Sequence, residues 1–268
     1  MKRFISCMLC IVMCASALVS CRWNKGSNVY KEPDIVYFDD IGYIERQDGY
    51  VLTDLSRYAS WKLIVPNELA DGKKVYAIRC DDFSKIDELY MGDNVAVVSL
   101  DNCEIKKLHI GASYTNGYFS DFKKDIIEEL SVSENNPRYY SKGNCLIERD
   151  THTVIYGCKN SVIPESALAI GNSAFSALTF ESFEIPKSVS KIGVSAFAHC
   201  KSLRSIYIPI TVAEIGSSAF YGTPDLVINC EANTKPENWD DHWCETEKII
   251  QLGAAKINWG VKHKTEDS

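Results

Sequence analysis

The sequence predicts a mainly β protein with short helical turns, in which about seven to eight coils of 19–26 residues stack as a solenoid. The first observation behind this prediction is the pattern Ile-Gly-x-x-Ala-Phe, which occurs at 170–175, 192–197 and 215–220. The second is an Ile-Pro pair seven residues before each copy. The period of 22 and then 23 residues gives a unit too short to bury its own apolar face, so successive units must stack.

Within one coil, from Glu184 to Ile206, the residue types suit their expected positions. Apolar residues alternate around a short strand, which ends at a proline because proline has no N–H to donate. A second short extended stretch leads to a glycine at a turn, where a residue free to adopt positive φ is favoured. The following alanine allows close contact between coils, and the phenylalanine fills the interior. These anchors recur at Ile170, Gly171, Phe175, Ile192, Gly193, Phe197, Ile215, Gly216 and Phe220.

Position by position, this coil resembles the BspA-type leucine-rich repeat of bacterial surface proteins. The resemblance extends over roughly residues 61–228. It implies a leucine-rich repeat solenoid of stacked, short parallel strands. It also implies a cell-surface role, such as adhesion to host proteins or to other bacteria.

Upstream, in residues 67–132, the repeat is degenerate. Strands are expected at 63–66, 89–91, 108–110 and 130–132, and the spacings of 26, 19 and 22 residues stay within the leucine-rich range. Ile78 and Phe83 keep the Ile-to-Phe spacing, with Asp82 in place of alanine. The alternative is that this half forms a separate small β domain.

Residues 133–161 predict one enlarged coil, before the regular coils at 162–228. The run Asn135-Asn136-Pro137 indicates a turn. Two short apolar runs, 145–147 and 154–156, then flank Asp150-Thr-His152 and predict a hairpin.

Both ends of such a solenoid need a cover, because an uncapped end exposes an apolar face. Residues 35–66 predict a capping hairpin around Asp48-Gly49, followed by the first strand. Residues 229–260 resemble the closing segment of the same family and predict a C-terminal cap, with 261–268 as a tail. The cap contains three tryptophans, Trp239, Trp243 and Trp259.

Residues 1–20 resemble a secretory signal, because Lys2-Arg3 precede a mainly apolar stretch that is too short for a comfortable membrane span. The stretch ends in Leu-Val-Ser-Cys, which resembles the lipobox of bacterial lipoproteins. This resemblance implies lipid on Cys21, a tether at 21–34, and a lipid-anchored protein at the outer membrane, facing either the cell surface or the periplasm. Ordinary cleavage near Ser20 without lipid is the alternative.

The chain is acidic, with a formal net charge of −7. Loss of residues 1–20 would remove two basic residues and no acidic ones, which gives −9. A chain this acidic is a poor binder of polyanions, so no nucleic-acid partner is expected. The expected partners are a protein or glycan ligand and, through the lipid alone, a membrane. The chain is expected to be a monomer.

Seven cysteines follow the predicted lipid site: Cys80, Cys103, Cys145, Cys158, Cys200, Cys230 and Cys244. Buried single thiols are expected, because cysteine packs as a small apolar residue. An exported protein can also form disulfides, and the sequence leaves the pairs Cys145–Cys158 and Cys230–Cys244 open. The spacing does not match a Cys-x-x-Cys zinc site, so neither a metal nor a cofactor is expected.

The sequence predicts no catalytic residue and therefore no enzyme. The five histidines are scattered over different units, and the adjacent His199 and Cys200 fall at a coil turn. His242 is expected to be a polar member of the C-terminal cap. Paired aspartates at 39–40, 81–82 and 240–241 lack the alternating oxygen ligands of a calcium loop and are expected in exposed turns.

The predicted function is non-enzymatic recognition on a shallow, strand-lined face, because solenoids present long regular surfaces to extended ligands. Variable polar positions give a tentative ligand face at Lys201, Arg204 and Tyr207. One alternative is an envelope glycan hydrolase, with exposed aromatics as sugar platforms and two carboxylates at a defined separation. Another is a structural subunit of an outer-membrane complex.

Overall fold

The computed structural model describes residues 34–80, 86–100, 104–116, 122–244 and 255–262. The predicted signal and Cys21 lie outside these ranges, as do Cys103 and the predicted turn at Asp82 and Phe83. Contacts divide the chain into two units, Met1–Asp34 and Ile35–Ser268, and the fold described below is that of the second unit.

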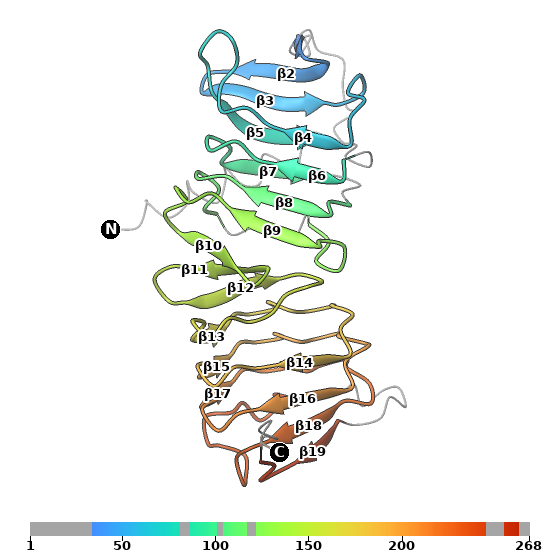
Figure 1. The fold of residues 1–268 in the computed structure, drawn as a ribbon, viewed down its shortest axis with the longest axis vertical. Helices are drawn as coiled ribbons and strands as arrows, with labels where there is room; N and C mark the ends of the chain where they lie inside the picture. Colours follow the sequence, from blue (N-terminus) through green and yellow to red (C-terminus); the bar gives the residue numbers. More distant parts are fainter. Residues whose placement is uncertain (1–33, 81–85, 101–103, 117–121, 245–254, 263–268) are drawn as a thin grey trace, which may run out of the picture. The chain divides into compact units, whose positions relative to one another are not determined.

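The strands of the first half form two sheets (Figure 1). One runs in the order β1 (Ile35–Phe38), β2 (Ile41–Arg46), β3 (Gly49–Asp54), β5 (Val75–Cys80) and β7 (Val97–Leu100). The other runs in the order β4 (Lys62–Ile64), β6 (Glu88–Tyr90), β8 (Lys107–Ile110) and β9 (Glu129–Val132).

The second half repeats this arrangement with two further sheets. One runs in the order β10 (Tyr139–Lys142), β11 (Cys145–Glu148), β12 (Thr153–Gly157), β13 (Ala169–Ile170), β15 (Lys191–Ile192) and β17 (Glu214–Ile215). The other runs in the order β14 (Ser182–Glu184), β16 (Ser205–Ile208), β18 (Val227–Cys230) and β19 (Lys256–Asn258).

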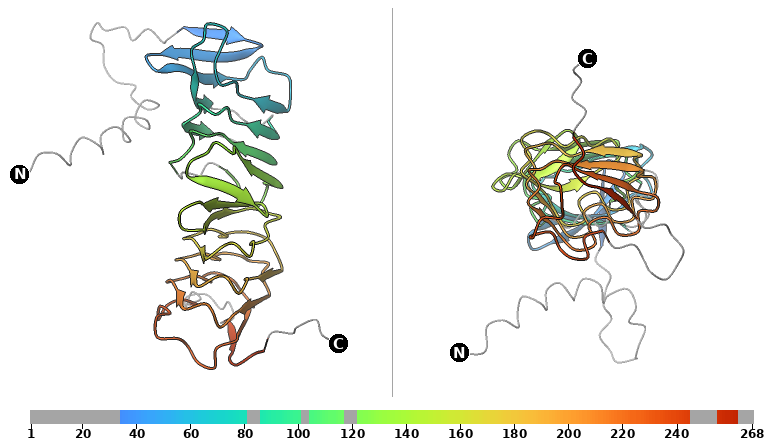
Figure 2. Two further views of the ribbon diagram at one scale, coloured as in Figure 1. Left: turned by 60° about the vertical axis from the view of Figure 1, so that its left-hand side comes forward. Right: turned by 90° about the horizontal axis from the view of Figure 1, so that it is seen from below.

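Parallel pairing links equivalent positions of consecutive coils. Leu63 pairs with Leu89, and Leu108 pairs with Leu130. The repeat anchors Ile170 and Ile192 pair in the same way one coil further on. The second unit is therefore a mainly β solenoid of about eight turns, and its coils overlie one another when viewed along the stack (Figure 2).

The predicted short helical turns are absent from the described residues, which contain strands and turns but no helix. At 173–177 the backbone adopts positive φ at Ser173 (53°) and Ala177 (62°), which interrupts any right-handed helical run. The N–H groups of Ser173, Phe175 and Ala177 donate to carbonyl oxygens 2.8–2.9 Å away in the next coil, at Val194, Ala196 and Ala198. Hydrogen bonds between coils thus replace the local i→i−4 bonds that a helix needs.

The repeated turns at 173–177, 195–199 and 218–222 make up one side of the solenoid, which we call the turn face. The aromatic anchors form a column inside this turn face. Phe175, Phe197 and Phe220 are fully buried, with ring centroids 5.4 and 5.5 Å apart and ring planes within 8° of parallel. Phe180 and Phe183 pack against the side of the column. The column gives the regular coils a continuous aromatic core.

Two groups of three antiparallel strands, β1–β3 and β10–β12, interrupt the parallel pattern. Near the start, β2 and β3 pair through a turn between Arg46 and Gly49, where the sequence predicts a hairpin. In the enlarged coil, β11 and β12 pair antiparallel, as the two apolar runs predict, and β10 adds a third strand. The buried Asn136 holds this coil by donating to the carbonyl oxygens of Gly111 and Tyr114, 2.9 and 3.2 Å away.

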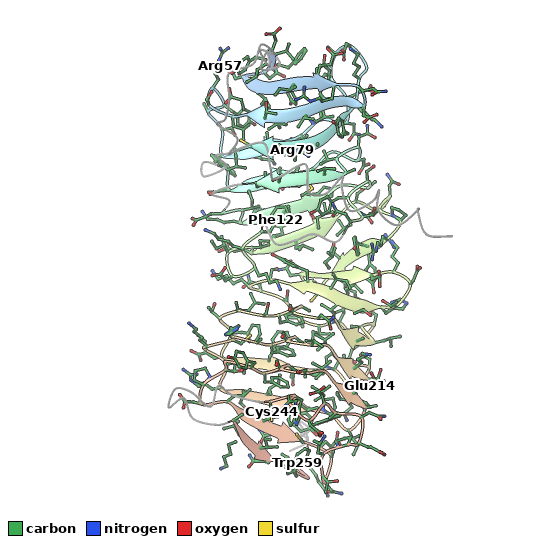
Figure 3. The ribbon with its side chains drawn as sticks, turned by 180° about the vertical axis from the view of Figure 1, so that it is seen from behind. Arg57, Arg79, Phe122, Glu214, Cys244 and Trp259 are labelled. Atoms are coloured by element: carbon green, nitrogen blue, oxygen red, sulfur yellow. The ribbon has the colours of Figure 1, made fainter. Side chains whose placement is uncertain are left out.

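Two apolar clusters make up the core, and they meet near the enlarged coil. Phe122, labelled in Figure 3, belongs to the first cluster, and its carbonyl oxygen accepts from the Tyr156 hydroxyl at 2.8 Å. The neighbouring Lys124 reaches the second half, where its ammonium donates to the carbonyl oxygens of Ser173 and Ala174. The junction of the two halves is thus both apolar and hydrogen-bonded.

Candidate ligand-binding groove

The candidate site lies on the sheet β4–β6–β8–β9. Along each strand, alternate side chains point inward, so the leucines at the centre of the strands are buried. The side chains on either side of these leucines point outward and align in register as two columns. One column contains Lys62, Glu88, Lys107 and Glu129, and the other contains Ile64, Tyr90, His109 and Ser131.

The first column is a ladder of alternating charges. The Glu88 carboxylate lies 3.9 Å from the Lys62 ammonium and 3.0 Å from that of Lys107, which in turn lies 3.7 Å from the Glu129 carboxylate. Opposite charges directly across neighbouring strands stabilise a sheet modestly. Because these charges neutralise one another, this column presents little net charge to a ligand.

The two middle positions of the second column are aromatic. The Tyr90 ring stacks on the His109 ring, with centroids 5.9 Å apart and planes inclined at 22°. Lys62 approaches the Tyr90 ring from the neighbouring strand, with its ammonium 4.6 Å from the ring centroid. His109 Nδ1 lies 3.0 Å from Ser131 Oγ, and Ile64 at the start of the column is 61% exposed.

A shallow groove of about 670 Å³ opens where these strands end, and we call it the strand-end groove. Its floor is mostly backbone, because Gly92 and Gly111 occur where coils approach closely. A Cβ on Gly92 would lie 2.7 Å from the Val65 carbonyl oxygen, and one on Gly111 would lie 2.3 Å from that of Gly92. The groove is lined by Ile64, Val65, Pro66, Asn67, Tyr90, Met91, Gly92, Asp93, His109, Val132, Ser133 and Glu134.

The charge of the strand-end groove is negative. The hydrogen bond from the Ser133 side chain holds the pKa of Asp93 below its usual value, and the N–H of Ala112 adds a second bond at 2.9 Å. Burial lowers the pKa of His109, so this ring is neutral at pH 7. Neither Asp93 nor Glu134 forms an ion pair within the ranges that the structure describes.

The groove brings a serine, a histidine and two carboxylates from different coils together, but not as a catalytic relay. A general base needs one ring nitrogen on the nucleophile and the other on a carboxylate. His109 bonds Ser131 through Nδ1, whereas Asp93 accepts from Ser133 and Ala112. Ser131 lies within β9, so it also lacks the exposed, strained turn of a nucleophile elbow.

The tentative ligand face from the sequence lies elsewhere, around β16. Lys201 and Arg204 are exposed, but the Arg204 guanidinium donates to the carbonyl oxygens of Lys201 and Pro224, 2.9 and 3.2 Å away, and so braces a turn. The half-buried Tyr207 donates its hydroxyl to the Val261 carbonyl oxygen at 3.3 Å. The structure does not bring these three residues into the strand-end groove, and their role in binding stays a prediction.

Sequence reasoning missed the strand-end groove because its residues are not repeat anchors. The available signal was alternation: in each predicted strand, the buried leucine is followed by one outward side chain. Reading that position across the strands gives Ile64, Tyr90, His109 and Ser131.

A second groove, of about 530 Å³, lies beside β15 and β17, and we call it the C-terminal groove. Its carboxylates include Glu214, labelled in Figure 3, which pairs with Lys191 at 2.8 Å. Trp239 lines this groove but is only 2% exposed, and Trp243 is 3% exposed. These two tryptophans are therefore core residues rather than platforms for sugars.

The remaining candidate groups have structural partners. Cys145, Cys158, Cys200 and Cys230 are free thiols, so neither Cys145–Cys158 nor Cys230–Cys244 is bridged. Burial raises the pKa of the Cys200 thiol to about 11, and this thiol contacts the Phe175 carbonyl oxygen, whereas the adjacent His199 packs against Tyr221. A protonated thiol is a poor nucleophile.

The aspartate pairs that the structure describes lie in turns. Asp39 and Asp40 form the turn between β1 and β2 with positive φ. Asp240 accepts from the His242 N–H, and Asp241 pairs with Lys235, each at 2.8 Å. Within the described ranges, no group of three or more histidine, cysteine, aspartate or glutamate side chains could hold a metal ion. The same ranges contain no helix long and apolar enough to cross a membrane.

Comparison with known proteins identifies the repeat. Residues 141–236 match the family model of the BspA type leucine rich repeat region, in six copies. No curated protein matches the chain.

Three solved structures are similar to parts of this chain. A leucine-rich repeat protein from Eubacterium ventriosum aligns over 72% of this chain and 70% of its own, at 16% identity and a TM-score of 0.43. The pneumococcal vaccine antigen PcpA aligns over 75% and 82%, at 13% identity and a TM-score of 0.32. A leucine-rich cell surface protein from Faecalibacterium prausnitzii aligns over 75% and 71%, at 16% identity and a TM-score of 0.30.

Proposed function

We propose that this protein, whose residues 141–236 are a BspA-type leucine-rich repeat region, is a non-enzymatic recognition protein that binds protein or glycan ligands at the cell envelope. The observation that carries the proposal is the strand-end groove. It is preformed, it runs across four strands, and outward side chains such as Ile64 and Tyr90 line it. An Ile64 side chain that is 61% exposed beside Tyr90 is better suited to contact a partner than to stabilise the free protein.

The proposal includes a lipid anchor at Cys21 and a location at the outer membrane. Its support is the sequence alone: the basic start, the apolar stretch and Leu-Val-Ser-Cys at 18–21. In this arrangement, adhesion to host proteins or to other bacteria is the role proposed for the solenoid.

The two ends of the solenoid are proposed to act as caps. The antiparallel strands β1–β3 lie at one end of their sheet, where Tyr43 and Leu52 join the apolar cluster that contains Ile78. At the other end, Trp239 pairs with Ile215 and donates its indole N–H to the Val212 carbonyl oxygen at 3.0 Å. Each segment covers apolar surface that a bare coil would expose.

A hydrolase is the second candidate function, because His109, which bonds Ser131, lines the same groove as two carboxylates. The missing bond between His109 and Asp93 argues against acyl chemistry, as set out above. For glycan hydrolysis, the burial of Trp239 and Trp243 removes two of the three tryptophans expected as sugar platforms, and Trp259 is partly buried. We therefore favour recognition.

The test uses the full chain without its lipid, screened against matrix proteins, mucins and glycans. For each ligand found, Ile64→Asp should weaken binding at least about tenfold, because it places a charge where the groove exposes its largest apolar contact. Ile210→Asp is the matched control, because Ile210 is 63% exposed and lies outside the groove. Equal effects of the two variants, or turnover of a bound glycan that His109→Ala abolishes, would contradict the proposal.

A further inference from the structure

We propose that the strand-end groove takes an extended polypeptide segment that carries lysine or arginine, rather than a glycan. This inference rests on the recognition function proposed above and names the chemistry of the occupant. It follows from three properties of the groove: both faces of the Tyr90 ring are covered, its most exposed apolar side chain, Ile64, is aliphatic, and its charge is negative.

The aromatic ring of the groove has no free face for a sugar. Carbohydrate recognition commonly uses an open ring face on which a sugar can stack. The two strands that flank β6 both cover the Tyr90 ring, with the His109 ring 5.9 Å away on β8 and the Lys62 ammonium 4.6 Å away on β4. What Tyr90 offers to a ligand is its edge, which suits lateral contact with a side chain.

The apolar contact that the groove offers is aliphatic. Ile64 on β4 is 61% exposed and Pro66 is half-buried, whereas Met91 is only 3% exposed and Val132 packs against the core. The groove crosses four strands that are about 4.8 Å apart, so its three steps span about 14 Å. That length corresponds to about four residues of extended chain, at about 3.3 Å per residue. A short extended segment with an apolar side chain placed on Ile64 fits this length.

The negative charge of the groove favours a positively charged partner. Asp93 and Glu134 are the charged side chains at its rim, and the hydrogen bonds to Asp93 keep that carboxylate ionised. Lys62 and Lys107 on the adjacent column are each paired with Glu88. A cationic side chain therefore meets two carboxylates that have no ion-pair partner among the described residues, whereas an acidic segment would be repelled.

The experiment measures binding to the full chain by fluorescence anisotropy, with two labelled pentapeptides as probes. One alternates leucine with lysine and the other alternates leucine with glutamate, and cellopentaose and chitopentaose compete for the site. The double variant Asp93→Asn with Glu134→Gln keeps the shape of both side chains and removes their charge. The control is Glu214→Gln with Glu237→Gln, which removes the same charge from the C-terminal groove.

We expect the lysine peptide to bind. The Asp93/Glu134 double variant should lower the affinity for this peptide about fivefold, which is the loss expected when two exposed charge contacts are removed. The control variant should leave its affinity unchanged, and the glutamate peptide should not bind. Equal binding of both peptides, or no peptide binding that depends on the groove, would overturn the inference. Oligosaccharide binding that Tyr90→Ala abolishes would also overturn it while supporting recognition by the groove, and the recognition proposal itself is decided separately by Ile64→Asp.

Discussion

At the scale of single residues, the repeat anchors show how little sequence is needed to define a coil. Ser173, Ser195 and Ser218 recur with the repeat and adopt φ values of 53°, 55° and 56°, which non-glycine residues adopt only when the surroundings require it. Their recurrence is visible in the sequence, but their backbone conformation is not. Serine is not a usual signal for positive φ, so the sequence favoured a short helical turn at a position where the structure has an inter-coil hydrogen bond.

The column of phenylalanines makes a stability prediction at this scale. Phe197→Ala should lower the free energy of unfolding by about 3–5 kcal/mol, because it removes a fully buried ring that stacks on Phe175 and Phe220. Urea unfolding followed by circular dichroism measures the change. Val194→Ala in the same coil is the control, since Val194 is 45% exposed, and it should change stability by less than about 0.5 kcal/mol. Similar unfolding midpoints for the two variants would contradict the column's role.

At the scale of elements, the turn face has a defined direction. The N–H groups of each turn donate to the carbonyl oxygens of the next coil, and the last turn donates from Ser218 and Phe220 to His242 and Trp243. At the first turn, the Ala174 carbonyl oxygen has no preceding turn of the same kind. It accepts instead from the Gly157 N–H at 2.9 Å and from Lys124 at 3.3 Å. Lys124 therefore links the degenerate half to the regular coils.

This link predicts a pH dependence. Burial lowers the pKa of Lys124 to about 8 in the folded protein, whereas an unfolded lysine titrates near 10.4. Between about pH 8 and pH 10.4 the unfolded state binds more protons at this residue, so its contribution to stability rises with pH. Compared with Lys124→Met, the wild type should gain stability across this window. Denaturant titrations at several pH values measure the difference.

The control for this prediction is Lys123→Met, which changes an exposed neighbour that pairs with Glu104. Because both variants keep every other titrating group, the comparison isolates Lys124. A wild-type curve that stays parallel to that of Lys124→Met from pH 8 to pH 10.4 would show that the buried amine does not have the lowered pKa.

At the scale of the whole molecule, the sequence predicts the solenoid and its repeat family but not its binding surface. Stacking follows from the repeat period, and the hairpin in the enlarged coil follows from the two apolar runs that became β11 and β12. The strand-end groove depends on outward residues such as Ile64 and Tyr90, which no repeat constrains. Their alignment appears only when the register of four strands is known.

Anchoring is also a property of the whole molecule, and it can be tested directly. Cys21→Ser removes the sulfur that would carry lipid, so the protein should move from the membrane fraction to the soluble or precursor fraction. Fractionation with immunoblotting measures the shift, and metabolic labelling with a fatty acid should mark the wild type alone. Unchanged membrane association without labelling of the wild type would remove the lipoprotein proposal. Cys244→Ser, which changes a cysteine far from the predicted signal, is the control.

The direction of the turn face has a consequence for self-association. Its last turn directs N–H groups toward the C-terminal end of the stack, where the carbonyl oxygens of His242 and Trp243 accept from Ser218 and Phe220. The first turn is not an end of the stack, because β12 pairs with β13 and the Gly157 N–H donates to the Ala174 carbonyl oxygen. Residues 239–243 therefore cover a row of N–H groups that would otherwise be free to pair with the edge of another chain.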